Sequence, residues 1–185
     1  MPGIPPLLKD NVNIVVDIDN TIADTQGALG HRFGTTANHY PWSVVPEGFF
    51  ESEEGINLLC SAEPFPGAAG ALRTLASRRC YITYVTIRPG SGTMAFGTEC
   101  WLRNNGFPVD GGIVFCGASH AKTSLVEVLR PAVVFEDDPA IAATLAREVP
   151  FVLVKNWPYN RYLFPGDTPP KLGLVRFDDW DECFR

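Results

Sequence analysis

Side chains able to do chemistry follow four separate apolar runs of the sequence. In chain order they are two carboxylates, a hydroxyl, an amine and two further carboxylates: Asp17 and Asp19, Thr86, Lys122, and Asp137 and Asp138. Carboxylates can hold a divalent cation, while an amine and a hydroxyl can hold an anionic group. These are therefore residue types suited to a catalytic or ligand-binding site, provided that the fold brings them together.

The apolar runs themselves predict a parallel β-sheet. They are continuous and rich in β-branched residues, which is typical of strands that helices cover on both faces. The expected strands are 12–17, 81–86, 112–115, 132–135 and 151–154, and the expected helices are 67–79, 93–105, 120–130 and 139–148. This alternation predicts a doubly wound, Rossmann-like α/β domain. The carboxyl ends of its strands would share one edge, so the side chains named above would meet there.

The segment 24–66 interrupts the alternation of strands and helices. It is irregular and rich in aromatic residues, and it is too long for a simple loop. We expect a small helical cap here, inserted after the first strand and lying over the carboxyl edge of the sheet. The cap would belong to a single domain that spans residues 1–185. Beyond residue 156 the chain is rich in proline, and its end predicts a short edge strand and a closing helix.

The composition excludes several functional classes. The 185 residues are 45% hydrophobic and 19% charged, which is typical of a globular protein. A net charge of −6 argues against an extended basic surface for nucleic acid. The sequence shows no signal-peptide pattern at its start and no apolar run long enough to span a membrane. Five cysteines without a CxxC pair favour free thiols and a cytoplasmic location.

Each candidate residue taken alone has an ordinary structural explanation. An aspartate at the end of a strand often forms a turn, and an acidic run suits the N-terminus of a helix. Thr86 could be a plain strand residue, and Lys122 a solvated charge. Arg88, two residues after Thr86, is either an anion ligand or part of a structural ion pair. The order of the four sets, more than any single residue, carries the functional prediction.

That order resembles the haloacid dehalogenase (HAD) superfamily of phosphohydrolases. The first motif of the superfamily, DxDxT, corresponds to the stretch DIDNT at residues 17–21. The second motif, a hydroxyl after an apolar strand, corresponds to Thr86, and the third, a lysine, corresponds to Lys122. The fourth motif corresponds to the acidic pair at residues 137 and 138. The resemblance covers residues 12–155, and it departs from the common pattern at Asn20, where many members have glycine.

The resemblance implies a Mg²⁺-dependent phosphatase. Asp17 would attack phosphorus and form an aspartyl-phosphate. Asp19 would protonate the leaving oxygen and then activate the hydrolytic water. The Mg²⁺ ligands would come from Asp17, the main-chain carbonyl of Asp19, and the pair Asp137 and Asp138.

The resemblance also assigns the groups that would bind the phosphate. Thr86 would donate a hydrogen bond to a phosphoryl oxygen, and Lys122 would offset the charge on that group and on Asp17. Arg88 would be a further phosphate ligand if it is not held in an ion pair. The expected partner is a small phosphorylated substrate, and no membrane is implied.

Two further stretches resemble nucleotidase-like members of the superfamily. The stretch TIRPGSGTMAFGTECWLRNNGFP is similar to the region after the second motif in 5'(3')-deoxyribonucleotidases and in the phosphatase domain of phage-type polynucleotide kinase. The WPYN at residues 157–160 resembles the segment after their last core strand. The resemblance implies a nucleotide or a similar small phosphate as substrate. Aromatic residues of the cap would either stack on the base or form the cap's own core.

Other classes fit the sequence less well. A receiver domain of two-component signalling has its lysine last, whereas Lys122 precedes the second acidic pair. Dinucleotide-binding and P-loop enzymes are disfavoured because neither GxGxxG nor GxxxxGK[ST] occurs. Three alternatives stay open within the superfamily: a phosphatase of polynucleotide ends, a phosphotransferase, and a binding or regulatory module without activity.

Overall fold

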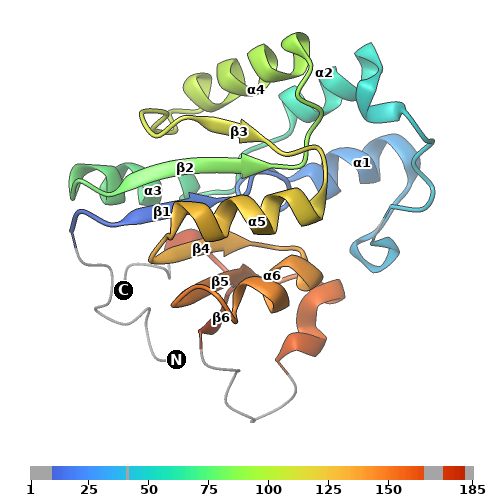
Figure 1. Ribbon diagram of the computed structural model, residues 1–185. Helices are drawn as coiled ribbons and strands as arrows, with labels where there is room; N and C mark the ends of the chain where they lie inside the picture. The colour runs from blue at the N-terminus through green and yellow to red at the C-terminus, as the bar shows by residue number, and fades with distance from the viewer. Residues whose placement is uncertain (1–9, 41, 165–172, 182–185) are drawn as a thin grey trace.

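Six parallel strands form one sheet in the computed structural model, which describes residues 10–40, 42–164 and 173–181 (Figure 1). The strands are β1 (Asn13–Val16), β2 (Tyr81–Thr86), β3 (Ile113–Phe115), β4 (Val133–Glu136), β5 (Phe151–Lys155) and β6 (Leu174–Phe177). Their spatial order is β3-β2-β1-β4-β5-β6, and each neighbouring pair is parallel. The predicted doubly wound parallel α/β fold is therefore confirmed.

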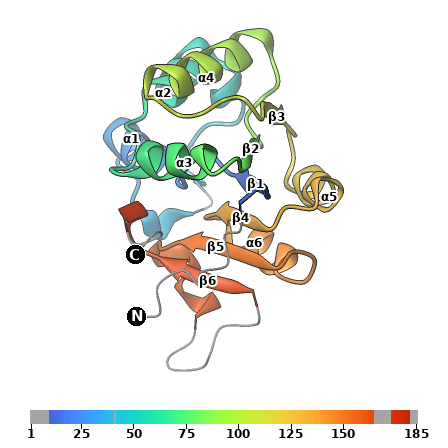
Figure 2. The same cartoon turned by 90° about the vertical axis from the view of Figure 1, so that its left-hand side faces the viewer.

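The central strand β1 is buried on both faces. Ile14 and Val16 belong to an apolar cluster with α3 (Ala68–Ser77), whereas Val15 belongs to a second cluster with α5 (Ser119–Leu129) and α6 (Pro139–Leu145). Figure 2 shows α3 on one side of the strands and α5 and α6 on the other. Because side chains alternate across a strand, one continuous apolar run fills both clusters.

Local capping signals begin several of the helices. Asp24 accepts a hydrogen bond from the first turn of α1 (Thr25–Phe33), Ser52 caps α2 (Glu53–Ser61), and Ser91 caps α4 (Gly92–Asn104). The four helices expected from the sequence are present as α3 to α6. The last of them ends at Leu145 and not at residue 148, because the N–H groups of Arg147 and Glu148 donate to residues three positions earlier, in a tighter 3₁₀ pattern.

The segment between β1 and α3 is helical, as expected for an insertion after the first strand. It contains α1, α2 and two short 3₁₀ turns, η1 (Ala37–His39) and η2 (Phe49–Glu51). The helix α2 lies beside α4, and the close approach occurs at Gly97, where a Cβ atom would lie 2.7 Å from the Sγ of Cys60. The limits 24–66 and the role of this segment as a cap stay predictions.

The C-terminal part contains the predicted edge strand, β6, at one side of the sheet. A 3₁₀ helix, η3 (Pro158–Leu163), follows β5. Trp180 is fully buried after β6 and stacks on Phe135 of β4, with the ring centroids 4.7 Å apart. The predicted closing helix would follow β6: residues 180 and 181 lie in a 3₁₀ turn, and residues 182–185 lie outside the described residues.

Two features bear on the expectations drawn from composition. In the described ranges, Cys60, Cys100 and Cys116 are free thiols. Within the same ranges, none of the helices is both long and apolar enough to cross a membrane.

Candidate active site

Residues 17–21 form a tight loop at the carboxyl end of β1. Asn20 adopts a left-handed conformation with φ of 58°, which asparagine tolerates better than most other residues. Two indole groups from the C-terminal part fix the loop. Trp157 Nε1 donates to the carbonyl oxygen of Asn20 at 2.8 Å, and Trp180 Nε1 donates to that of Thr21 at 3.0 Å. These contacts join the first motif to chain segments more than 130 residues away, at separations of 137 and 159 residues.

Lys122, in the first turns of α5, lies between two buried carboxylates. Its amine donates to Oδ1 of Asp17 and lies 2.8 Å from Oε2 of Glu136. Burial alone would lower the pKa of Lys122, but the adjacent Asp17 and Glu136 raise it above its ordinary value. The amine therefore stays charged, and it joins the candidate nucleophile to the end of β4.

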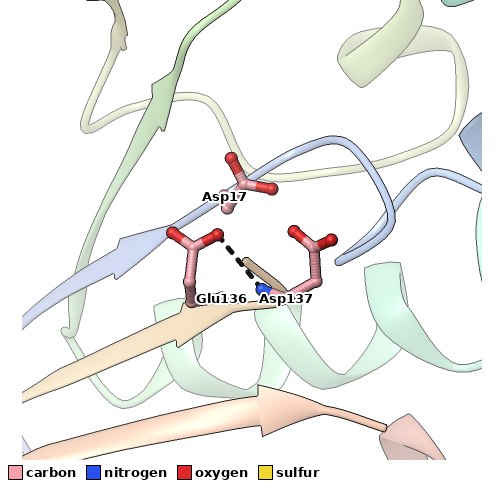
Figure 3. A group of neighbouring side chains, drawn as sticks. All are labelled: Asp17, Glu136 and Asp137. Carbon is pink, nitrogen blue, oxygen red and sulfur yellow. Dashed lines mark hydrogen bonds between the residues drawn. The ribbon is translucent and has the colours of Figure 1, made fainter. Parts of the chain in front are cut away.

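Asp17, Glu136 and Asp137 form a cluster that we call the acidic floor (Figure 3). One carboxylate oxygen of each residue lies within 4.8 Å of the others, and all three residues are buried. Carboxylate oxygens at this spacing fit a hard divalent cation, which takes oxygen ligands. The donor set of the floor therefore fits a metal site.

The charges of the floor also fit a bound cation. Burial raises the pKa of Asp17 to about 7, with Glu136 and Asp19 adding to the rise and Lys122 opposing it. The pKa of Asp137 lies well above its usual range, first because of burial and then because of Asp17 and Glu136. A divalent cation beside these groups would favour their ionised forms. When all three carboxylates are ionised, Lys122 by itself leaves the floor with excess negative charge.

The carboxylate of Asp19 is held by Arg88 through a two-point ion pair. Arg88 Nε donates to Oδ2 at 2.9 Å and Nη2 donates to Oδ1 at 2.7 Å. The guanidinium also donates to the Thr98 hydroxyl and to the carbonyl oxygen of Leu59. Burial by itself would raise the pKa of Asp19. The effect of Arg88 is opposite and prevails, so the pKa of Asp19 lies below its ordinary value. Arg88 thus has the ion-pair geometry that was one of its two expected roles, and a contact with phosphate stays a prediction.

Thr86 and Asp138 both make protein contacts beside the floor. Thr86 ends β2 next to β1, and its buried hydroxyl accepts the N–H of Arg88 at 3.2 Å. Asp138 Oδ1 accepts two N–H groups at the start of α6, and Oδ2 accepts the hydroxyl of Tyr40. Asp138 therefore faces α6 and Tyr40, whereas Asp137 lies in the floor. The predicted phosphate-binding and metal-binding roles of Thr86 and Asp138 stay predictions.

Aromatic side chains from the segment between β1 and α3 line the pocket that contains the floor. The pocket has a volume of about 140 Å³. We call Tyr40, Trp42 and Phe50 the aromatic wall; all three line the pocket, together with Leu59, Ile87 and Ile141. The centroid distances are 5.6 Å from Tyr40 to Trp42 and 6.0 Å from Trp42 to Phe50. The rings thus pack on one another and also border the space above the carboxylates.

Two residues of the site had no role assigned from the sequence. Glu136 is the last residue of β4, and its Oε1 accepts the N–H groups of Asp137 and Asp138, both at 3.1 Å. A carboxylate at the end of a buried apolar run needs a partner, and this signal could have identified Glu136. The other residue is Tyr159, whose hydroxyl donates to Oδ2 of Asp137. Only its place in the WPYN stretch distinguished Tyr159 in the sequence.

Comparison with solved structures identifies the fold. A HAD-type hydrolase of Bacillus subtilis bound to magnesium matches with a TM-score of 0.59 and 14% identity, over 94% of this chain and 97% of that one. A candidate beta-phosphoglucomutase of Thermotoga maritima matches with a TM-score of 0.55 and 18% identity, over 93% and 96% of the two chains. The chain therefore has the HAD-type fold, as its motif order predicts.

Comparison of sequences adds one relative from Bacillus cereus, described as a candidate nucleotidase. It is 28% identical to this chain over 186 residues, which cover 90% of the chain and 93% of the relative. No family model matches the sequence.

Proposed function

We propose that this protein is a Mg²⁺-dependent phosphomonoester hydrolase that acts through an aspartyl-phosphate. The observation that carries the proposal is the position of Asp17. Its buried carboxylate accepts a hydrogen bond from Lys122 and lies within an acidic cluster that borders a pocket. A carboxylate nucleophile needs positive charge beside it before an anionic phosphate ester can approach.

Asp17 and Asp137 are the carboxylates proposed to hold the Mg²⁺, with the main-chain carbonyl of Asp19. Asp138 is a weaker candidate because it lies outside the acidic floor, with one oxygen capping α6 and the other accepting the Tyr40 hydroxyl. When bound, Mg²⁺ supplies positive charge that offsets the phosphoryl oxygens and favours the ionised form of Asp17. Lys122 holds Asp17 in place, and Glu136 holds Lys122.

The proposed reaction has two steps that the chain's own residues carry. In the first, an oxygen of Asp17 forms a bond to phosphorus while the bond to the leaving oxygen breaks, and Asp19 gives that oxygen a proton. In the second, water attacks phosphorus and loses a proton to Asp19, the bond to Asp17 breaks, and inorganic phosphate leaves. Each step restores the protonation that the other consumes.

The ion pair with Arg88 makes the two roles of Asp19 unequal. Arg88 lowers the pKa of Asp19 and so favours its base form. A leaving group such as p-nitrophenolate needs little protonation and would depend on Asp19 only in the second step. We therefore expect the Asp19→Asn variant to accumulate phosphoenzyme with p-nitrophenyl phosphate, and intact-protein mass spectrometry would detect the added phosphoryl group.

The proposed substrate is a nucleotide or a similar small phosphate. The relative described as a candidate nucleotidase supports this class, and so does the aromatic wall, because aromatic rings stack on nucleobases. In the described residues, the two cations that line the pocket, Lys122 and Arg88, are paired with Asp17 and Asp19. That pairing favours a substrate with a single phosphoryl group over a bisphosphate.

The test is hydrolysis of p-nitrophenyl phosphate with and without Mg²⁺, followed by a screen of nucleoside monophosphates, sugar phosphates and phosphorylated oligonucleotides. We expect turnover that chelation with EDTA removes and Mg²⁺ restores. Asp24→Asn is the matched control for Asp17→Asn, since it makes the same change in a nearby residue and asparagine also caps a helix. Equal activity of the Asp17→Asn variant and the parent would refute the proposal.

A further inference from the structure

Two stacked tyrosines contact the two adjacent carboxylates at the end of β4. The rings of Tyr40 and Tyr159 lie 4.2 Å apart between centroids, with an interplanar angle of 18°. The hydroxyl of Tyr159 donates to Asp137 Oδ2, and the hydroxyl of Tyr40 donates to Asp138 Oδ2. The two contacts look alike, but only Asp137 belongs to the acidic floor. The pair therefore offers an internal comparison between a contact within the site and a contact beside it.

The direction of the Tyr159 hydrogen bond is fixed by Asn20. The side-chain oxygen of Asn20 accepts the N–H of Gln26 at 2.8 Å, which turns its amide nitrogen toward Tyr159. That nitrogen donates to the Tyr159 hydroxyl oxygen at 3.2 Å. A phenol has a single proton, and the oxygen already accepts one hydrogen bond, so the proton points to Asp137. Asn20 of the first motif thus orients Tyr159, which contacts Asp137 of the fourth motif.

Both the side chain and the main chain of Asp137 are held by neighbouring residues of η3. Beside Tyr159, the amide nitrogen of Asn160 donates to the carbonyl oxygen of Asp137 at 2.9 Å and to that of Lys155 at 2.8 Å. On the other side of the carboxylate, Oδ1 lies 3.4 Å from the Thr21 hydroxyl, which also lies 3.1 Å from Asp17 Oδ2. The Asp137 carboxylate is therefore turned with Oδ2 toward Tyr159 and Oδ1 on the side of Asp17.

We propose that Tyr159 is a positioning residue that orients the Asp137 carboxylate to receive the divalent cation. The inference rests on the proposed function, because it assigns Asp137 to the metal site. Partners that hydrogen-bond to a metal-binding carboxylate fix its orientation, and their loss typically weakens metal binding 10- to 100-fold. The tyrosine and asparagine of the WPYN stretch thereby acquire a function: they hold the side chain and the main chain of the same aspartate.

The test measures binding of Mg²⁺ alone, by isothermal titration calorimetry, to the parent, Tyr159→Phe and Tyr40→Phe. Each variant loses one hydroxyl and keeps its ring in the stacked pair. We expect the Kd for Mg²⁺ to rise about 10-fold or more in Tyr159→Phe and to change less than about 3-fold in Tyr40→Phe. With p-nitrophenyl phosphate, the Mg²⁺ concentration for half-maximal activity should rise in Tyr159→Phe, while kcat recovers at saturating Mg²⁺. A purely structural role would lower kcat at every Mg²⁺ concentration.

The outcomes separate this inference from the proposed function. If the parent binds Mg²⁺ and hydrolyses phosphate esters but Tyr159→Phe binds Mg²⁺ equally well, the positioning role is wrong and the proposed function stands. If both variants weaken binding equally, the role is not specific to Asp137 and the inference is again wrong. A parent that binds no Mg²⁺ overturns both. Should Tyr159→Phe unfold at the assay temperature, Asn20→Gly is the second variant. Glycine keeps the backbone conformation at position 20 and removes the donor that orients Tyr159. A Kd for Mg²⁺ in Asn20→Gly equal to that of the parent would contradict the inference.

Discussion

The acidic floor and the aromatic wall border the same pocket, but different interactions hold them. Floor residues sit at the ends of β1 and β4, where the N–H of Asp17 donates to the carbonyl oxygen of Phe135 at 2.9 Å and continues the sheet ladder. Wall residues come from the segment between β1 and α3, and they meet one another mainly through ring contacts. One hydrogen bond, from Trp42 Nε1 to Gln26 Oε1 at 2.6 Å, anchors the wall to α1.

Because of this difference, we expect changes in the two regions to affect different kinetic parameters. A change in the floor alters charge where the phosphoryl group would react, so its main effect should be on kcat. A change in the wall alters contact area for the part of the substrate that does not react, so its main effect should be on KM. Variants of each region test this expectation.

The largest effect is expected from Asp17→Asn. The amide keeps the shape of the side chain but cannot attack phosphorus, so kcat should fall by about 10³-fold or more. The free energy of unfolding should not fall, because asparagine is neutral and the floor loses one of its crowded negative charges. Steady-state hydrolysis of p-nitrophenyl phosphate and chemical denaturation measure the two quantities. Residual activity within tenfold of the parent would remove Asp17 from the role of nucleophile.

Lys122→Met should affect both activity and stability. We expect kcat to fall by about 10²-fold, as for other single groups that stabilise charge in the transition state. The free energy of unfolding should fall by about 3 kcal/mol, because Asp17 and Glu136 lose their shared buried partner. Added Mg²⁺ should recover part of the stability and little of the activity. Full recovery of kcat by Mg²⁺ would mean that Lys122 only neutralises the negative charge of the floor and has no separate effect on the transition state.

The difference between floor and wall also explains what the sequence could predict. Asp17, Lys122 and Asp137 each follow a strong apolar run, so the parallel topology was enough to bring them to one edge. Glu136 follows the expected strand 132–135 but received no role, because the resemblance assigns only the acidic pair after it and its contact with Lys122 depends on the fold. Tyr159 was missed because its contact with Asp137 depends on how η3 folds back after β5, which no local pattern encodes.

The wall was predicted only in outline. The aromatic composition of residues 24–66 indicated a helical insertion, but the packing of Tyr40 on Tyr159 joins residues 119 positions apart and follows from tertiary contacts alone. The ion pair between Arg88 and Asp19 also could not be predicted, because the sequence allowed Arg88 to be either an anion ligand or part of a structural ion pair. The fold shows the guanidinium buried among Asp19, Thr98 and Leu59, while its contact with phosphate stays a prediction.

Phe50→Ala tests the wall without leaving a polar group unpaired. The loss of the ring should raise KM for nucleoside monophosphates about 5-fold or more, which corresponds to roughly 1 kcal/mol of stacking, and should leave kcat within about 2-fold. Phe96→Ala is the matched control, since Phe96 is an exposed aromatic residue of α4 outside the pocket lining. A fall in kcat as large as that of Lys122→Met would show that the wall also positions the floor.

The smallest effect is expected from Tyr84→Phe, in a buried polar group that belongs to neither region. In the described residues the Tyr84 hydroxyl is buried without a hydrogen-bond partner, inside the apolar cluster that contains Trp101 and Phe107. Its removal ends a desolvation cost, so the free energy of unfolding should rise by about 1 kcal/mol, with kcat and KM unchanged. Tyr81→Phe on the same strand is the control, because Tyr81 is 66% exposed and its hydroxyl can contact water. In the floor, by contrast, Lys122 pairs with Asp17 and Glu136, and Tyr159 donates to Asp137, so a stabilising Tyr84→Phe would distinguish the unpaired hydroxyl in the core from the paired carboxylates of the floor. A destabilised Tyr84→Phe would instead mean that an ordered water satisfies this hydroxyl, and buried polarity would then not distinguish the floor from the rest of the core.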